Sequence, residues 1–332
     1  MGSDTDSEES SLTVITAGGA WSHRVTHAPT LSTPWSCNVP IDTHSGEADL
    51  TVACLQFEPR IGELEANRAT GIELIETVAD DGATLVVLPE LSDSGYVFQT
   101  RAEAFSLAGA AADSETIRGW SEVARRRGLH IVGGFAEREG GKLFNSAAVV
   151  GPDGLIGVYR KTHLWDAENL WFDPGDKGYP VFATPLGRIG VLICYDGWFP
   201  EAWRLLAMQG ADIVCVPTNW VPMPSQPDAL PAMSNILCMG AAHSNSFCVA
   251  AACRVGTERG QPFIGQSLVV NHEGWPVAGP ASKDRGEVLM ARLNLADARR
   301  RRRLNDFNQL LRDRRTDLYG EMLGTELKPG WY

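Results

Sequence analysis

Three residues in this sequence form a set that could carry out nucleophilic chemistry: Glu90, Lys161 and Cys194. Glu90 and Cys194 directly follow apolar runs typical of buried strands, and a strand end holds a side chain in a fixed position. A thiol attacks an electrophilic carbon when a base removes its proton and a cation or N–H group stabilises the oxyanion. Glu90 could be the base, Lys161 the stabilising cation and Cys194 the nucleophile.

Each of the three residues also has an ordinary explanation. A solvated loop acid can follow a strand, and a lone cysteine at a strand end is more often part of a buried core. Lys161 is one of only five lysines beside 24 arginines, and its compact charge suits a single oxyanion. We expect the helix start after Cys194 to lower the thiol pKa. A papain-like pairing with His163 or His243 is the alternative, although the cysteine signature of that class is missing.

The elements that must position these residues follow from hydrophobic periodicity. The expected strands cover residues 50–57, 85–89, 131–135, 145–150 and 190–193, and the expected helices cover 63–79, 114–127 and 200–209. Gly82 and Gly128 mark the ends of the first two helices. Glycine-containing turns at 140–141 and 152–154 separate the strands in between.

The second half of the chain repeats a pattern of the first half. Residues 81–89 resemble residues 209–217, and residues 147–154 resemble residues 267–274 in the same order. Chance similarity between apolar strands is the alternative explanation. The shared order and turns favour two related helix–strand–strand units, which would pack as two sheets with helices outside, in one domain.

Composition excludes several classes of protein. The chain has 332 residues, of which 44% are hydrophobic, so it can bury a large core and is not disordered. Its formal net charge is −12, which disfavours binding to nucleic acid. It contains no apolar run of 18 residues, so we expect no membrane span. A phosphate-binding G-x-G-x-x-G motif after the first strand and a P-loop are also missing, which argues against a nucleotide-binding domain.

The cysteine pattern favours a reducing compartment. Seven cysteines form no C-x-x-C motif, and several lie in apolar runs, as expected for buried thiols. No zinc-ligand spacing is present, and Cys238, His243 and Cys248 lie in an apolar stretch, so we expect no metal. Because the N-terminus is acidic and lacks a signal peptide, we expect a cytoplasmic protein.

The two ends of the chain differ from its centre. Residues 1–48 are rich in Ser, Thr, Pro and His and are predicted to be a flexible or loosely packed extension, in which residues 12–16 could pair as an edge strand. The folded unit is expected at 49–325, followed by a tail at 326–332. The arginine-rich stretch at 299–303 could bind nucleic acid or acidic residues of another subunit. The apolar spacing of residues 304–311 favours a solvated helix instead.

The three chemical segments, in this order, resemble the glutamate, lysine and cysteine signatures of the carbon–nitrogen hydrolase (nitrilase) superfamily. The resemblance covers roughly residues 50–325 and includes Pro217-Thr-Asn-Trp220, Arg254-Val-Gly-Thr-Glu258 and the segment 313–319. It implies an α/β fold, a four-layer αββα sandwich with two mixed β-sheets flanked by helices. It also implies a homodimer or larger homo-oligomer that needs no cofactor.

The resemblance assigns roles to individual residues. Glu90 matches the general base, Lys161 the oxyanion-stabilising lysine and Cys194 the nucleophile, and Glu168 matches a second glutamate that positions the lysine and the substrate. The sequence Cys-Tyr-Asp-Gly at Cys194 is similar to amidase and carbamoylase members, whereas nitrilases tend to have Cys-Trp-Glu. This implies hydrolysis of a small amide to acid and ammonia through a thioester. An N-carbamoyl amidohydrolase, a nitrilase and a non-catalytic scaffold are the alternatives, in that order.

Aromatic residues beside the motifs are candidates for substrate binding. We expect Tyr96, Trp198 and Trp220 to shape the pocket and the backbone N–H of Tyr195 to contact the oxyanion, although core packing would explain the aromatic rings equally well. Trp171 and Phe172 could line the entrance. No clear basic pair is available for a substrate carboxylate, although Arg204 and Arg254 are candidates, so an aliphatic or arylalkyl amide is expected before an N-carbamoyl compound.

Overall fold

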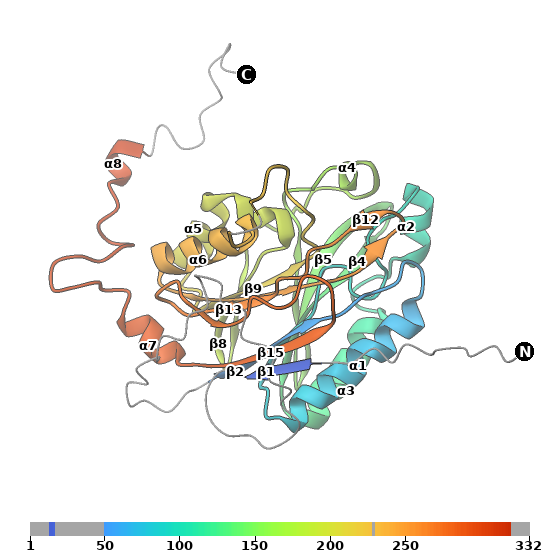
Figure 1. The fold of residues 1–332 in the computed structure, drawn as a ribbon, viewed down its shortest axis with the longest axis horizontal. Coiled ribbons are helices and arrows are strands. Elements are labelled where there is room, and N and C mark those ends of the chain that lie inside the picture. The colour runs from blue at the N-terminus through green and yellow to red at the C-terminus, as the bar shows by residue number, and fades with distance from the viewer. Residues whose placement is uncertain (1–12, 17–49, 228–229, 320–332) are drawn as a thin grey trace, which may run out of the picture.

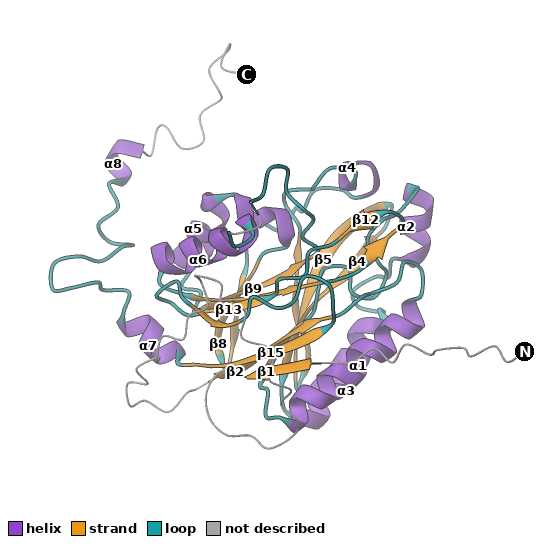
Figure 2. Ribbon diagram, viewed as in Figure 1, coloured by secondary structure: helices purple, strands orange, loops and turns teal. Residues whose placement is uncertain are grey.

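The computed structural model describes residues 13–16, 50–227 and 230–319. Two β-sheets lie face to face in this part of the chain, and helices cover the outer face of each sheet (Figure 1). Figure 2 shows the helices on both sides of the central strands. The predicted αββα sandwich with two mixed sheets is therefore confirmed.

The first sheet has seven strands in the order β1-β15-β2-β3-β4-β5-β6. β2, β3 and β4 are parallel neighbours, whereas β4, β5 and β6 are antiparallel. Its strands are β1 (Thr13–Thr16), β2 (Leu50–Gln56), β3 (Leu85–Val87), β4 (His130–Glu139), β5 (Lys142–Gly151), β6 (Gly154–Arg160) and β15 (Glu287–Leu293). The outer helices are α1 (Leu64–Asp80) and α3 (Glu115–Arg127).

The second sheet has six strands in the order β14-β13-β10-β9-β8-β7. Its strands are β7 (Val181–Thr184), β8 (Gly187–Val191), β9 (Ile213–Thr218), β10 (Cys248–Cys253), β13 (Leu268–Val270) and β14 (Pro276–Ala278). The outer helices are α5 (Pro200–Met208) and α6 (Met233–Asn245). Shorter elements on the connections are α2 (Arg101–Leu107), α4 (Glu168–Trp171), the 3₁₀-helix η1 (Cys194–Trp198) and the β11–β12 hairpin (Thr257–Glu258 and Gln261–Pro262).

Five strands of each sheet share the same topology. β2-β3-β4-β5-β6 and β8-β9-β10-β13-β14 each contain two parallel pairings followed by two antiparallel pairings. α1 and α3 follow the first two strands of one unit, and α5 and α6 occupy the same positions in the other. The two related units predicted from the sequence repeat are therefore present, and their sheets pack together in one core.

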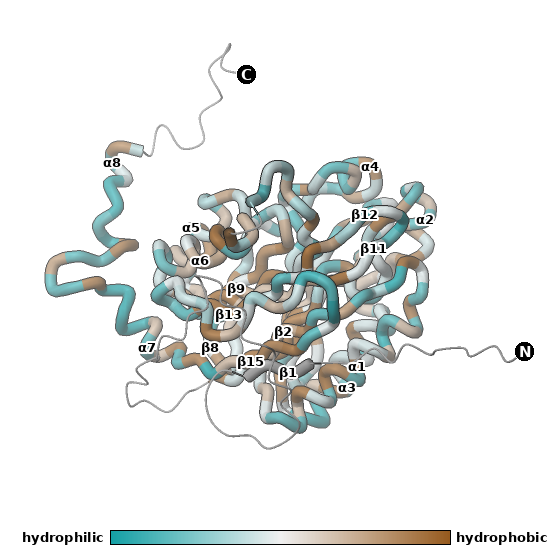
Figure 3. Tube along the Cα trace, viewed as in Figure 1, coloured by the Kyte–Doolittle hydropathy of each residue, from teal (hydrophilic) through white to brown (hydrophobic). Residues whose placement is uncertain are grey.

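Alternation along the strands explains why the layers form. Val52 and Cys54 of β2 join the apolar cluster that the second sheet contributes to, whereas Ala53 and Leu55 join the cluster that contains residues of α1 and α3. Successive side chains of a strand point to opposite faces, so a continuous apolar run buries both faces of the sheet. The hydropathy colouring follows this arrangement, with hydrophobic segments concentrated in the central strands (Figure 3).

The structure confirms the predicted helices with small shifts at their ends. In α3, the Ser114 hydroxyl caps the first turn by accepting a hydrogen bond from the N–H of Ile117, and Gly128 ends the helix with a positive φ of 70°. The strands β4 and β5 are longer than predicted because their polar ends continue to pair up to the turn at Gly140 and Gly141.

The predicted helix over residues 304–311 is wrong. α7 (Leu295–Arg300) ends before it, and α8 (Thr316–Tyr319) begins after it. The side-chain carbonyl of Asn305 accepts hydrogen bonds from the N–H groups of Phe307 and Asn308, which favours a turn over a helix. Phe307 is 84% exposed, so this segment buries little apolar surface that would stabilise a helix.

Few of the terminal residues lie in the described part of the chain. β1 pairs in parallel with β15, as the edge-strand alternative predicted. The rest of the predicted extension (1–12 and 17–48) and the predicted tail (326–332) lie outside the described residues. None of the described helices is long and apolar enough to cross a bilayer. Six of the seven cysteines are described, and all six are buried, whereas Cys37 lies outside the described residues.

Candidate active site

Strand ends bring the predicted chemical residues together. Glu90 follows β3 by three residues, Lys161 directly follows β6, and Cys194 follows β8 as the first residue of η1. Glu90 and Lys161 come from the first sheet, whereas Cys194 comes from the second. β9 packs against β3 and β4, so the ends of both sheets meet at this site.

Lys161 is held between two buried carboxylates. Its Nζ atom lies 2.6 Å from Oε1 of Glu90 and 2.6 Å from Oε1 of Glu168. The Asn145 side-chain amide donates a hydrogen bond to the same Glu90 oxygen at 2.7 Å, and the Tyr96 hydroxyl donates to the same Glu168 oxygen at 2.5 Å. The structure therefore brings three of the four predicted catalytic residues into direct contact. Tyr96 supports this cluster through its hydrogen bond to Glu168.

The charges in this cluster shift one another's pKa values. Burial raises the pKa of Glu90 to about 7, with Lys161 lowering it and Glu168 raising it. Burial lowers the pKa of Lys161, but the carboxylates of Glu168 and Glu90 outweigh that effect and raise it above its usual range. At neutral pH the lysine is therefore a cation, and Glu90 can exchange a proton readily.

The thiol of Cys194 does not have the lowered pKa that the sequence led us to expect. Burial raises its pKa well above the usual value, the negative charge of Glu90 adds to this, and Lys161 opposes it. The α-helix α5 begins only at Pro200, and the short 3₁₀-helix η1 that Cys194 opens does not offset the effect of burial. The resting thiol is protonated, and attack requires a base that accepts its proton.

The backbone at Cys194 has an unusual conformation. Its φ is +47°, in the left-handed region that residues other than glycine rarely adopt. Cys194 opens η1, and the first N–H groups of a helix lack partners within the helix. The N–H of Tyr195 follows directly after the nucleophile in this turn, and its contact with an oxyanion stays a prediction.

A small apolar pocket adjoins Cys194. Tyr195, Trp198 and Trp220 line it, as predicted, together with Trp165, Asn219, Val221 and Met223. The Tyr195 ring lies 5.0 Å from the Trp165 ring and 6.1 Å from the Trp198 ring. Of the predicted binding residues, only Tyr96 is not among those that line this pocket, because it contacts Glu168 and Phe263 instead.

Two further sets of residues considered from the sequence are not among those that line this pocket. Phe172 is buried against Phe98, and Trp171 packs on the same apolar cluster, so neither lines the pocket. The two arginines considered as carboxylate anchors are bound elsewhere: Arg254 to Glu258 and to a backbone carbonyl, and Arg204 to the carbonyl of Ser244.

Several buried polar atoms around Cys194 have no partner within the described residues. They are Oε2 of Glu90, Oε2 of Glu168, Oδ1 of Asn145, Oδ1 of Asn219 and Nε1 of Trp220. Leaving buried polar atoms unpaired costs free energy, so such a group of atoms is expected where a polar ligand binds. Four of the five are acceptors, so the site suits a ligand with N–H donors.

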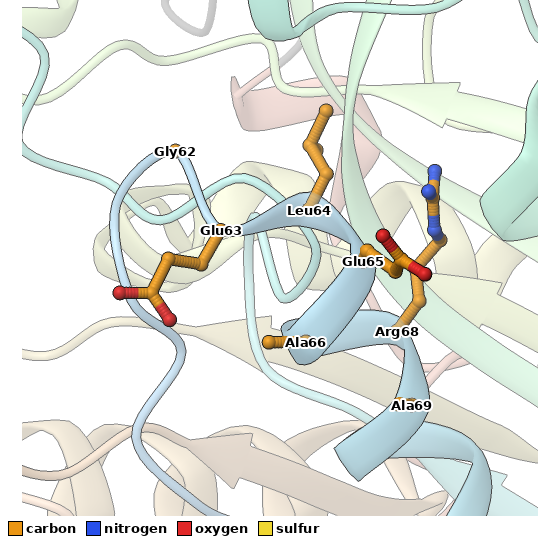
Figure 4. A pocket seen from close by; sticks show the side chains of 7 residues that line it. All are labelled: Gly62, Glu63, Leu64, Glu65, Ala66, Arg68 and Ala69. Carbon is orange, nitrogen blue, oxygen red and sulfur yellow. The ribbon is translucent and has the colours of Figure 1, made fainter.

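A second hollow has a different lining from the pocket at Cys194. It surrounds the first turn of α1 and is lined by small and charged residues, including Glu63, Glu65 and Arg68 (Figure 4). It contains no cysteine or histidine.

Among the described residues, no cluster of three or more His, Cys, Asp or Glu side chains could hold a metal ion.

Sequence reasoning missed four residues at the site. Asn145 and Asn219 bind the side chain and the backbone carbonyl of Glu90, Trp165 lines the pocket, and Asp196 binds the turn of Cys194. Asn145 lies among apolar residues in β5, where a polar residue is a recognisable signal. Trp165 and Asp196 gave no signal beyond their nearness to Lys161 and Cys194 in the sequence.

The model of the carbon-nitrogen hydrolase family matches residues 51–303 of this chain. The chain belongs to this family. The hydrolase is 43% identical over 268 residues to a nitrilase of Pyrococcus abyssi, covering 81% of this chain and 98% of that protein. It is 33% identical to an N-carbamoylputrescine amidase of Solanum tuberosum, covering 82% of this chain and 95% of the relative.

The solved structures agree with the fold of this hydrolase. It superposes on a carbon-nitrogen hydrolase from Helicobacter pylori G27 with a TM-score of 0.74 at 29% identity, covering 83% of this chain and 98% of that one. The protein is therefore an enzyme that hydrolyses carbon–nitrogen bonds. The resemblance to the superfamily found in the sequence is confirmed.

Proposed function

We propose that this hydrolase cleaves a small neutral amide to an acid and ammonia through a thioester on Cys194. The observation that carries this proposal is the buried contact of Lys161 with Glu90 and Glu168 beside the pocket of Cys194. Glu90 serves as the general base, Lys161 stabilises the oxyanion, and Glu168 holds Lys161 and the substrate.

The steps follow from the charges at the site. Glu90 accepts the proton of Cys194 as the sulfur attacks the amide carbon, and the oxyanion rests against Lys161 and the N–H of Tyr195. Glu90 then gives the proton to the leaving nitrogen, and ammonia departs. Water then attacks the thioester while Glu90 accepts its proton, the C–S bond breaks to release the acid, and Glu90 returns the proton to the sulfur.

The unpaired acceptors favour an amide over a nitrile. A primary amide brings two N–H donors to Oε2 of Glu90, Oε2 of Glu168 and Oδ1 of Asn219, whereas a nitrile nitrogen brings none. The Cys-Tyr-Asp sequence at Cys194 supports the same preference. The Pyrococcus abyssi relative is named a nitrilase, so nitrile hydrolysis is the second candidate and belongs in the test.

The pocket lining favours an uncharged apolar substituent. Aromatic rings and Met223 form most of the lining, and no lysine or arginine is part of it. An aliphatic or arylalkyl amide fits this lining best. An N-carbamoyl amine offers the same terminal amide, and the Solanum tuberosum relative is named for such a substrate, so this class comes next.

Ammonia release from a matched substrate series tests the proposal. The series holds one arylalkyl group constant and varies the reacting group as primary amide, N-carbamoyl amine and nitrile. We expect the highest kcat/KM for the amide, and no release by Cys194→Ala or Glu90→Gln. Release by Cys194→Ala at the wild-type rate would refute the thioester mechanism, and a preference for the nitrile would refute the substrate assignment.

We also propose a homodimer in the cytoplasm. Leu205 and Met208 on α5 and Met233 and Ile236 on α6 are exposed apolar residues on the adjoining outer helices of one face. A second copy would cover them. The burial of all six described cysteines suits a reducing compartment. Sedimentation equilibrium should give a dimer, and Met208→Glu with Ile236→Glu should shift it to a monomer.

A further inference from the structure

A buried carboxylate links the turn of the nucleophile to the strand end of Lys161. Asp196 lies two residues after Cys194, and its side chain is fully buried. Oδ2 accepts hydrogen bonds from the N–H of Ile193 at 3.1 Å and from the hydroxyl of Tyr159 at 2.7 Å. Oδ1 accepts from the N–H of His163 at 3.0 Å and lies 2.9 Å from its Nδ1 atom.

The positions of these partners in the sequence explain what the contacts fix. Ile193 directly precedes Cys194, whereas Tyr159 and His163 lie two residues before and two residues after Lys161. Cys194 and Lys161 come from different sheets, and no hydrogen bond joins their side chains within the described residues. Asp196 therefore connects the two backbones on either side of the reacting groups.

The surroundings hold this network of Asp196, Ile193, Tyr159 and His163 in place. The His163 ring stacks on Phe199 with 3.6 Å between centroids and 10° between planes, and the Tyr159 ring stacks on Tyr179. The contact with the N–H of Ile193 also fixes the residue that precedes the positive φ of Cys194. A strained turn persists only when its neighbours hold it in place.

We propose that Asp196 is a positioning residue that sets the separation between the Cys194 sulfur and the Lys161 ammonium. The proposal rests on the proposed function, in which the oxyanion formed by Cys194 must meet Lys161. A displacement of about 1 Å between reacting groups can lower a rate by about 10²-fold. The side-chain hydrogen bonds of Asp196 go to Ile193, Tyr159 and His163, none of which lines the pocket, so Asp196 acts through the two backbones.

Asp196→Asn is the sharpest probe, because the amide has nearly the same shape as the carboxylate. Each carboxylate oxygen accepts one backbone N–H, from Ile193 or from His163. Whichever way the new amide points, its NH₂ group faces one of these N–H donors, and that contact must open. The variant should therefore move the strand ends of Lys161 and Cys194 apart without leaving a cavity in the core.

The test compares amide turnover with a thiol reaction that forms no oxyanion. Turnover is measured with the amide that the wild-type enzyme hydrolyses best, and Cys194 modification is measured with methyl methanethiosulfonate by peptide mass spectrometry. We expect Asp196→Asn to lower kcat about 10²-fold with a smaller change in KM, and to change the modification rate by less than about 3-fold. A folded variant with kcat within about 3-fold of wild type would overturn the proposal. An equal loss in both reactions would also overturn it, since Asp196 would then shape the nucleophile alone.

Tyr159→Phe keeps the test decisive if Asp196→Asn does not fold. It removes one contact on the lysine side and keeps the ring, and we expect kcat to fall about tenfold with an unchanged modification rate. Tyr179→Phe is the comparison variant, because its hydroxyl makes no hydrogen bond to Asp196 and lies 3.5 Å from Nδ1 of His163, so kcat should fall by less than in Tyr159→Phe. Unchanged turnover in Tyr159→Phe would overturn the proposal. Cys194→Ala turnover at the wild-type rate would instead refute the proposed function.

Discussion

The Nζ atom of Lys161 lies 2.6 Å from Oε1 of Glu90, and both side chains are fully buried. Neither charge would be stable alone in this position, because the desolvation of an unpaired buried charge costs on the order of several kcal/mol. Together with Glu168 they form a cluster that carries a permanent cation and a carboxylate able to exchange a proton near neutral pH. A thiol beside this cluster has both a base and an electrophile available.

The pH dependence of turnover should report the ionisation of Glu90. Its pKa is raised to about 7, and the base form is the carboxylate. We expect kcat/KM to fall about tenfold per pH unit below this value and to level off above it. The measurement is a pH–rate profile with a neutral amide, since the substrate must not titrate. A profile that stays flat down to pH 5 would contradict the assignment of Glu90 as base.

The stability contributed by Glu90 should show the opposite pH dependence. Its pKa is higher in the folded protein than in the unfolded chain, so the folded protein binds more protons between about 4.5 and about 7. The contribution is fully present below the unfolded pKa and is lost as the pH rises through about 7. Denaturant titrations should show this as a free energy of unfolding that falls between about pH 4.5 and about pH 7 in the wild type. The same fall should be absent in Glu90→Gln. An equal pH dependence in both proteins would contradict the raised pKa.

Removal of the Tyr96 hydroxyl should weaken catalysis more than folding. Tyr96→Phe loses the 2.5 Å hydrogen bond to Glu168 and keeps the ring that packs against Phe263. Glu168 then holds Lys161 less firmly, and we expect kcat to fall about tenfold, in line with the loss of one hydrogen bond to a charged group. Steady-state kinetics and thermal unfolding are compared. A drop in melting temperature without a drop in kcat would show that Tyr96 is only structural.

The ion pair of Arg254 and Glu258 should matter far more for stability than the exposed pairs. Glu258 binds Arg254 at 2.8 Å and also accepts hydrogen bonds from the N–H groups of Tyr96 and Val97. Breaking such a buried pair costs about 3–5 kcal/mol, so Glu258→Ala should destabilise the protein by about that amount. Arg303→Ala is the control, because its pair with Asp306 is exposed and should contribute less than about 1 kcal/mol. Equal effects in urea titrations would refute this ranking.

Cys194 should be the first of the described cysteines to react with a thiol reagent. It lines the pocket and is 7% exposed, whereas the other five described cysteines are more deeply buried. For four of these five, the pKa gives no advantage over Cys194, since burial also raises the pKa values of Cys54, Cys215, Cys238 and Cys253. Iodoacetamide labelling followed by peptide mass spectrometry measures the order. Faster labelling of Cys215 or Cys253 would contradict the described pocket.

The sequence predicted those parts of the site that depend on strand ends. Glu90 and Cys194 follow apolar runs, and a buried strand fixes where the next residues lie, so their convergence with Lys161 could be anticipated. The contact between Tyr96 and Glu168 could not, because it joins two connections 72 residues apart in the sequence. Loop residues meet through tertiary packing, which periodicity does not describe.

Two errors have the same physical origin. The pKa of Cys194 was expected to be lowered, and residues 304–311 were expected to form a helix. Both expectations used local features, a nearby helix start and apolar spacing. Both outcomes depend on burial: the sulfur is more buried than its position in the sequence suggests, and Phe307 is much more exposed. Burial is a property of the whole fold, so a local pattern cannot supply it.

The thioester on Cys194 is the central claim, and it can be observed directly. Wild-type enzyme is mixed with the preferred amide, quenched with acid during turnover and digested, and the peptide that contains Cys194 is weighed by mass spectrometry. We predict a mass increase equal to the acyl group on that peptide, and none in Cys194→Ala. Turnover by wild-type enzyme with no acyl adduct, together with an active Cys194→Ala variant, would contradict the account.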